Sequence, residues 1–405
     1  MLELDCGQPF DLAGEEKFFA TVPPRAGVLL VEPRMAGAQP HLVRTADLRR
    51  AAERLLRPPD PLSKRLNLRE VAAAIRYRLT GSKFEQTLAL YHQAKQHLPH
   101  RYRDLLRLRR PALLKVNLHN EYPRCYVTQR IRPDGFYFGP FASRHAADAF
   151  AEGFLDLFKI RRCQIKIRRD PSYPGCIYSE MKMCLAPCFA GCTKEEYDAE
   201  VMRVLETLNT TGTALTVALE RERAAASEAL QFERAALLHK RLEKASAALR
   251  GLPELVRRIE NLDAVILQRS AEEKTIVLFA IRGGLLDEPV FLRFGELSSQ
   301  PQSIDATLRH TLQPHTVPVD PPADPAATQA DATSPSNSRE AYGLRAAPPE
   351  LTEHLSLVAR WFYSKPREGE ILFRDKDWPY RRIVRAIGRL LAPPGPPPAV
   401  TPPNS

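Results

Sequence analysis

Several features that would fix the class of a protein are scarce or missing in this chain. Only seven cysteines are spread over 405 residues, which excludes a small disulfide scaffold. No run of about 18 apolar residues occurs, so no membrane-spanning helix is expected. The first ten residues, MLELDCGQPF, carry acids and no basic stretch ahead of an apolar one, unlike a secretory signal. These absences together predict a cytoplasmic protein.

Positive charge, by contrast, is abundant and unevenly placed. The net charge is +11, and residues 101–170 hold 16 Lys and Arg against 7 Asp and Glu. Such a segment is typical of a protein that binds a phosphate backbone, although a solvated basic surface is the alternative. The DNA-contacting side chains that we expect belong to two Arg-Arg pairs within it: Arg161, Arg162, Arg168 and Arg169.

Composition and periodicity divide the chain into several parts. Hydrophobic residues make up 44% of it, and its length predicts two to four domains. Short apolar strands and amphipathic helices are both present, which predicts an α+β multidomain fold. The expected parts are an α/β domain at 1–105, a cysteine-rich α/β region at 106–195, a helical segment at 196–255, a small β segment at 256–312, a disordered Pro-rich linker at 313–349, a C-terminal helical unit at 350–392 and a disordered tail at 393–405.

Some elements can be placed more closely. Apolar runs at 27–33 and 40–45 predict strands, and helical periodicity follows at 46–56 and 84–98. A further helix is expected from Arg144 to Phe158, with Ser143 as its N-cap.

Four cysteines lie close together in the sequence, with the spacing C-x12-C-x7-C-x3-C: Cys163, Cys176, Cys184 and Cys188. Clustered thiolates in a reducing compartment usually ligate a metal. The spacing is wider than the usual pairs of a zinc site, and four thiolates also suit an iron–sulfur cluster. Four unrelated buried cysteines are the remaining alternative, and Cys192 lies close enough to be a spare.

Residues 122–192 resemble the central region of the UvrC family. The motifs that carry the resemblance are YPRCYVT, GFYFGPFASRHAADAF, RRCQIKI and CLAPC, in that order. In the family the equivalent cysteines hold a [4Fe–4S] cluster. The resemblance therefore implies this cofactor for the four clustered cysteines, with zinc as the alternative.

Residues 219–249 resemble the UVR motif, the helical hairpin by which UvrC docks on UvrB. Small alanines would let its two helices approach closely, and we expect Leu230, Phe232 and Leu238 to form the apolar seam between them. An ordinary intramolecular hairpin is the alternative. The L-x-F-E-x-A-A core of the motif, expected to bind the partner, falls on Leu230, Phe232, Glu233, Ala235 and Ala236.

Residues 27–100 resemble the GIY-YIG nuclease domain in layout only. The two tyrosine positions hold Leu29 and His41, the arginine position holds Ala51, and the metal-binding glutamate position holds Leu90. Hydrolysis of a phosphodiester needs a carboxylate-held metal and a cation beside the phosphate, so we expect no catalytic residues here. Glu85 is the nearby carboxylate that a different alignment would offer.

The combined resemblance implies a shortened, UvrC-like nucleotide excision repair protein. Beyond the β segment we find no acidic triad and no helix-hairpin-helix glycines. We therefore expect a non-catalytic adaptor of the excinuclease system that binds DNA and UvrB. A divergent single-incision DNA endonuclease and an iron–sulfur, redox-responsive DNA-binding regulator stay open as alternatives. Trp361 and Trp378 either stack on bases or form the core of the C-terminal unit.

Overall fold

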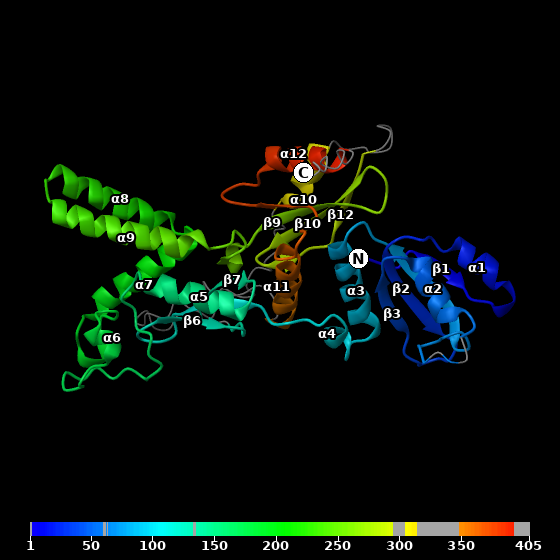
Figure 1. The fold of residues 1–405 in the computed structure, drawn as a ribbon, viewed down its shortest axis with the longest axis horizontal. Coiled ribbons are helices and arrows are strands. Elements are labelled where there is room, and N and C mark those ends of the chain that lie inside the picture. Colours follow the sequence, from blue (N-terminus) through cyan, green and yellow to red (C-terminus); the bar gives the residue numbers. More distant parts are fainter. Residues whose placement is uncertain are drawn as a thin grey trace, which may run out of the picture.

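The computed structural model describes residues 2–59, 62, 64–132, 135–294, 304–313 and 348–392. These residues form helices and three antiparallel sheets, which confirms the mixed α+β class. In Figure 1 the N-terminal domain lies at one end of an elongated molecule, and a helical hairpin projects at the other. The described part of the chain contains no helix with the length and hydropathy of a membrane span. The predicted disordered segments fall mainly on 314–347 and 393–405, outside the described residues.

A four-stranded sheet organises the N-terminal domain. Its elements are β1 (Cys6–Pro9), a 3-10 turn (Leu12–Gly14), α1 (Glu15–Thr21), β2 (Gly27–Pro33), β3 (His41–Thr45), α2 (Leu48–Leu56), β4 (Ala72–Leu79), α3 (Lys83–His97) and α4 (Tyr102–Leu105). The strand order is β1-β4-β2-β3. Successive side chains of β2 point to opposite faces, so Leu29 packs with α1 and α2 while Val28 packs with α3. Both predicted strands and both predicted helices are present, whereas β1, α1 and β4 were not predicted.

A second four-stranded sheet, of order β6-β5-β7-β8, carries the cysteine-rich segment and the hairpin. Its elements are β5 (Ala112–Asn117), β6 (Arg124–Thr128), β7 (Phe136–Phe141), α5 (Arg144–Leu155), α6 (Ile177–Glu180), a 3-10 turn (Pro187–Phe189), α7 (Lys194–Asn209), α8 (Thr213–Glu228), α9 (Phe232–Arg250) and β8 (Arg257–Arg258). The predicted N-cap is confirmed, because the Ser143 side chain accepts a hydrogen bond from the Ala146 N–H. The helix ends at Leu155, a turn earlier than expected.

The third sheet joins the chain segments on either side of residues 314–347. Its region comprises a 3-10 turn (Ile259–Asn261), β9 (Ala264–Arg269), β10 (Thr275–Arg282), β11 (Leu285–Leu286), β12 (Val290–Arg293), α10 (Ile304–Leu312), α11 (Pro348–Phe362), β13 (Glu370–Phe373) and α12 (Tyr380–Leu391). Strand β13 pairs antiparallel with β9, with Ile371 opposite Ile266. The expectation of a purely helical unit at 350–392 is therefore wrong, because its short apolar run completes a sheet. Trp361 and Trp378 are both buried, which favours the core alternative over base stacking.

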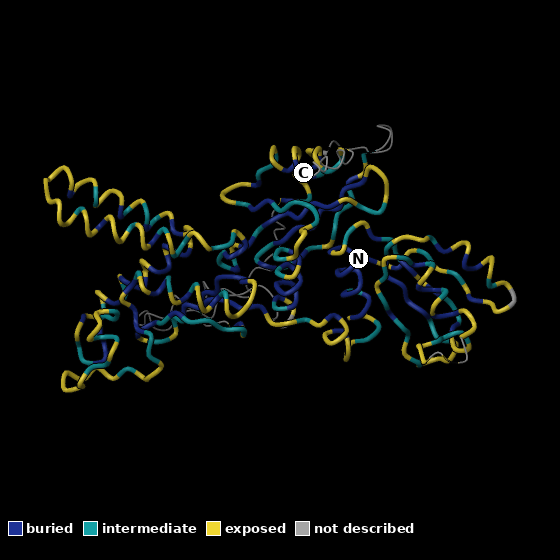
Figure 2. Tube along the Cα trace, in the orientation of Figure 1, coloured by how far each residue is buried: buried dark blue, intermediate teal, exposed yellow. Residues whose placement is uncertain are grey.

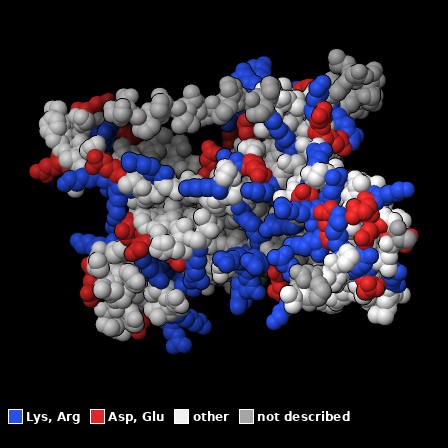
Figure 3. Space-filling view, turned by 45° about the vertical axis from the view of Figure 1, so that its right-hand side comes forward, with Lys and Arg blue, Asp and Glu red and all other residues white. Residues whose placement is uncertain are grey.

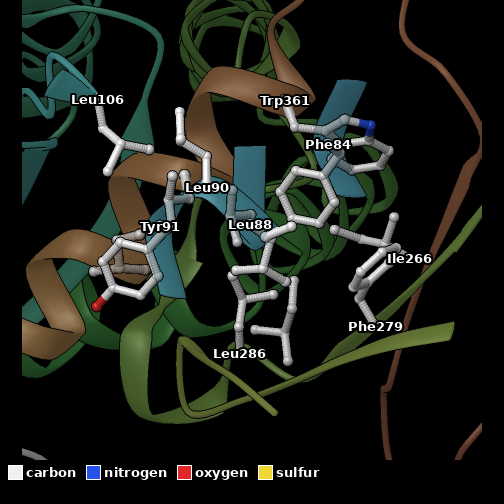
Figure 4. Packing of buried hydrophobic residues seen from close by; sticks show 14 of the residues in the cluster. Phe84, Leu88, Leu90, Tyr91, Leu106, Ile266, Phe279, Leu286 and Trp361 are labelled. Atoms are coloured by element: carbon white, nitrogen blue, oxygen red, sulfur yellow. The ribbon is translucent and has the colours of Figure 1, made fainter. Parts of the chain in front are cut away.

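Helix α3 connects the N-terminal domain to this third sheet. Phe84 lies edge-on to Phe279 of β10, with ring centroids 5.0 Å apart, and 5.6 Å from the Trp361 ring of α11. Leu88, Leu90 and Tyr91 continue the same apolar cluster along the helix, as Figure 4 shows. The N-terminal domain and the C-terminal elements thus share one core.

Candidate functional site

The four clustered cysteines lie in the loop-rich segment between α5 and α7, around the short helix α6. Cys188 is buried and the other three are half-buried. The electrostatic surroundings of Cys184 include the thiols of Cys163, Cys176 and Cys188, so the four side chains occupy one neighbourhood. Among the described residues, no three His, Cys, Asp or Glu side chains are gathered as the ligands of one metal ion.

The backbone of this segment turns repeatedly around the sulfur atoms. Lys182, Ala186 and Ala190 have positive φ values of 56°, 56° and 61°, and the Ala186 N–H donates to Cys184 Sγ at 3.3 Å. Burial raises the pKa of Cys184 to about 11. The hydrogen bond from the Ala186 N–H lowers this pKa, and the nearby thiols of Cys163, Cys176 and Cys188 raise it further. Ligation would therefore displace a proton from Cys184.

The two Arg-Arg pairs are largely used within the fold. Arg161 is buried, and its guanidinium donates to the Tyr122 and Ile165 carbonyls at 2.7 and 2.8 Å. Arg162 pairs with Asp156 at 2.7 Å, and Arg169 donates to the Cys192 carbonyl at 3.0 Å. Of the four expected DNA contacts, only Arg168 is exposed without a partner among the described residues. Arg161 is therefore unsuited to contact DNA, because it is buried and donates to the carbonyl of Tyr122, ahead of β6, and to that of Ile165 in its own loop.

Helices α8 and α9 form the projecting hairpin, which is exposed over most of its length in Figure 2. Their seam is made by Ala226, Leu238 and Ala245, which are buried. Gly212, at the base of α8, has a φ of 94° and approaches Leu249 so closely that a Cβ would clash with it. The hairpin is therefore packed at its base and along its seam.

The expected seam residues at the tip do not face inward. Leu230 is 71% exposed in the turn and Phe232, the first residue of α9, is 67% exposed. Glu233 and Ala236 are exposed, and Ala235 is half-buried against the hairpin core. The prediction that Leu230 and Phe232 join the two helices is wrong, since both side chains are mostly exposed; of the three residues expected in the seam, only Leu238 is buried there.

Residues 112–207, which run from β5 into α7 and include all four clustered cysteines, match the family described as the UvrC/Cho excinuclease middle domain. Over these residues the chain is similar to UvrC proteins. The UvrABC system protein C of Oleidesulfovibrio alaskensis is 32% identical over 227 residues, which cover 55% of this chain and 32% of that protein. That of Carboxydothermus hydrogenoformans is 28% identical over 278 residues, which cover 68% of this chain and 45% of that protein. The chain thus spans less than half the length of these relatives, and no solved structure matches it.

The four positions that the sequence resemblance aligned with nuclease residues do not lie together in one site. Leu29 and Ala51 are buried together beneath α1 and α2. Leu90 is buried on the other face of the sheet, in the core shared with α11. His41 is half-buried at the start of β3, where burial and then the charge of Arg54 lower its pKa. Three of these positions therefore hold apolar side chains packed in hydrophobic cores.

The nearby carboxylates have other roles. Ala51 borders a cavity of about 920 Å³, whose acidic residues are Asp47 and Glu53. Asp47 caps α2 by accepting the Arg50 N–H, and Glu53 pairs with Arg57 at 3.1 Å. Glu85 accepts the Gly81 N–H at 2.7 Å, and its burial raises its pKa to about 7. These side chains support helix ends and ion pairs, so none of them resembles a prepared metal ligand.

Proposed function

We propose that this chain is a UvrC-like, non-catalytic adaptor in nucleotide excision repair, which binds DNA and docks on UvrB through the α8–α9 hairpin. The observation that carries the proposal is the apolar tip of that hairpin. Leu230, Phe232 and Leu237 are all more than 60% exposed, at the end of an arm that projects from the body.

Exposure of the apolar tip to water is unfavourable in free energy, and binding of a partner would remove this exposure. Large apolar side chains left in water forgo the stabilisation of about 25 cal/mol per Å² that burial provides. Clustered exposed apolar residues on a soluble protein usually mark an interface. The hairpin does not need them for its own folding, because its seam lies at Ala226, Leu238 and Ala245. UvrB is the partner that the UVR motif implies.

The absence of catalysis is proposed from the N-terminal domain. Incision would need a bound divalent metal, a group to activate water and a cation at the phosphate. Leu29, Ala51 and Leu90 supply none of these groups, and they pack into two different cores. A protein with this domain would depend on another subunit for cleavage.

We further propose that the cysteine segment holds a [4Fe–4S] cluster rather than zinc. Cys163, Cys176, Cys184 and Cys188 would be the ligands, and the amide of Ala186 would hydrogen-bond to a ligating sulfur, as is typical of such sites. The segment between α5 and α7 has little regular structure. A bound cluster would cross-link it and stabilise its fold, because ligation contributes directly to the free energy of folding.

Binding of the full-length chain to purified UvrB tests the adaptor role. Phe232→Ala should weaken binding about 30-fold, since truncating an aromatic anchor often costs about 2 kcal/mol. Val217→Ala is the matched control, because Val217 is an exposed apolar residue on α8 of the same hairpin. If wild-type protein does not bind UvrB, or if Phe232→Ala and Leu230→Ala both bind as wild type does, the adaptor role is refuted.

A further inference from the structure

Six arginines surround a cavity of about 870 Å³ where the N-terminal domain, the second sheet and α11 meet. The described residues that line it include no Asp or Glu. Figure 3 shows basic side chains gathered across the middle of one face of the molecule. The fold therefore brings together charges from β3, from the segment between α4 and β5, from the start of α5 and from α11. These arginines are Arg44, Arg107, Arg109, Arg110, Arg144 and Arg360.

Most of this charge is not neutralised within the described chain. Arg144 pairs with Asp148 at 3.4 Å, and the other five arginines form no ion pair with a described carboxylate. Arg44 and Arg360 are held in place by neutral acceptors, the Thr87 hydroxyl at 3.1 Å and the Arg107 carbonyl at 2.8 Å. Burial of Arg360, and then the charges of Arg44 and Arg109, lower its pKa. Such mutual repulsion is relieved when an anion enters.

The cavity wall also offers groups suited to a nucleotide. Ala142 and Ser143 line it at the N-terminus of α5, a 12-residue helix whose dipole favours an anion there. Tyr363 lines it from the end of α11, and its hydroxyl donates to the Pro140 carbonyl at 3.0 Å, which fixes the ring. Guanidinium groups beside a fixed aromatic ring are the combination by which proteins bind single strands.

We propose that this arginine cavity binds an unpaired DNA strand, with the guanidinium groups on its phosphates and Tyr363 against one of its bases. The inference rests on the proposed DNA-binding function, and it specifies where the DNA binds and in which form. The volume is within the range of pockets that enclose small ligands, so a nucleotide fits, whereas a duplex is too wide to enter. Leu90 lines the cavity, whereas Leu29 and Ala51 are buried in a separate core between the first sheet, α1 and α2.

The test measures the affinity of the full-length protein for a fluorescent oligo(dT) strand and for a duplex of the same length. Arg109→Glu with Arg110→Glu should weaken single-strand binding about tenfold or more and flatten its salt dependence, because phosphate contacts are lost. Arg382→Glu with Arg385→Glu is the control, since these exposed arginines lie on α12 and reverse the same amount of charge. Tyr363→Ala should cost about fivefold or more, and Tyr363→Phe should keep most of the affinity because the ring remains.

The outcomes separate this inference from the adaptor role. Unchanged single-strand affinity in the Arg109 and Arg110 double variant, with its melting temperature preserved, would overturn the cavity assignment. An equal loss in the α12 control would do the same, because general charge would then explain binding. UvrB binding should be unaffected in both double variants, because the arginine cavity and the hairpin tip are different surfaces. If the wild-type protein binds single strands but does not bind UvrB, the adaptor role is refuted and the cavity assignment stands.

Discussion

The hydroxyl of Tyr91 on α3 donates a 2.8 Å hydrogen bond to the carboxylate of Glu353 on α11. Tyr102 and Arg103 donate to the other oxygen of Glu353 at 2.7 and 2.8 Å. Both Tyr91 and Glu353 are buried. The Glu353 carboxylate thus accepts hydrogen bonds from three side chains and joins the N-terminal domain to helix α11, inside the core that they share.

Glu353→Ala should therefore destabilise the protein by about 2–4 kcal/mol, because it leaves buried donors without an acceptor. Thermal unfolding measures this loss. Glu350→Ala is the control on the same helix, since Glu350 is 49% exposed and makes only a 3.5 Å ion pair with Lys95. Equal melting temperatures for the two variants would show that the hydrogen bonds of Glu353 do not contribute to the stability of the fold.

The same carboxylate predicts an acid dependence. Burial on its own would raise the pKa of Glu353, but the hydrogen bonds from Tyr102, Tyr91 and Arg103 lower it below the ordinary value. Its contribution is then complete above the ordinary glutamate pKa and is lost as the pH falls through the lowered one. Glu353→Gln should flatten that acid limb in urea unfolding.

Glu85 should show the opposite dependence. Its pKa is raised to about 7 by burial, so the folded state keeps the proton after the unfolded chain has released it. Stability should fall as the pH rises from about 4.5 to about 7 and then level off. Glu85→Gln should stabilise the protein at pH 8 by about 1 kcal/mol or more, since an amide oxygen can still accept the Gly81 N–H. The exposed Glu70→Gln should change nothing, and a pH-independent effect of Glu85→Gln would contradict the assignment.

The cysteine proposal predicts a coloured protein when it is purified without oxygen. Cys184→Ser or Cys188→Ser should remove iron and acid-labile sulfide together and lower the melting temperature. Cys6→Ser is the control, because Cys6 lies in β1 of the N-terminal domain. Stoichiometric zinc without iron or sulfide would defeat the cluster.

The hairpin tip allows stability and binding to be separated. Leu230 has a φ of 57°, a left-handed conformation that costs a non-glycine residue about 1–2 kcal/mol and that asparagine tolerates better. Leu230→Asn should leave the hairpin as stable as wild type or more so, while weakening UvrB binding. Circular dichroism and binding measured on the same sample check both, and an unchanged affinity would remove Leu230 from the interface.

Restoring nuclease residues should fail. Wild-type protein should not nick plasmid or damaged duplex with Mg²⁺ or Mn²⁺. Leu29→Tyr, Ala51→Arg and Leu90→Glu combined should not rescue nicking and should destabilise the fold by several kcal/mol, since they bury charged groups without partners. Metal-dependent nicking by wild-type protein that a single substitution in residues 27–100 abolishes would overturn the non-catalytic role.

The sequence predicted the elements whose pattern is local. Gly27–Pro33 and the Ser143-capped helix were found because an apolar run and a capping hydroxyl act within a few residues. Strand β4 was missed, since its AAAIRYRL sequence has good helix formers that only pairing with β1 and β2 overrides. Strand β13 was missed because its four residues form a strand only against β9.

The candidate site was predictable to a similar extent. Sequence spacing predicted that the four cysteines form one ligand set, which stays a prediction, although the other three thiols influence Cys184. It was not enough to tell that Arg161 is buried and that Phe232 is exposed, because burial depends on which distant segments pack nearby. The arginine cavity was missed for that reason. Its one sequence signal is the RLRRP run at 107–111, and Arg44 and Arg360 join it only in the folded chain.

The hydrogen bond between Tyr91 and Glu353 spans 262 positions of the sequence. It therefore constrains the order in which parts of the molecule can fold during synthesis. Helix α3 is synthesised long before α11, which covers it only after the intervening sheets have been translated. Until then Phe84 and Leu88 lack part of their final packing, and β9 has a bare edge where β13 will pair. Closing so long a loop is slow, and half-covered apolar surfaces invite aggregation. The N-terminal domain thus cannot reach its final packing until α11 and β13 have been synthesised.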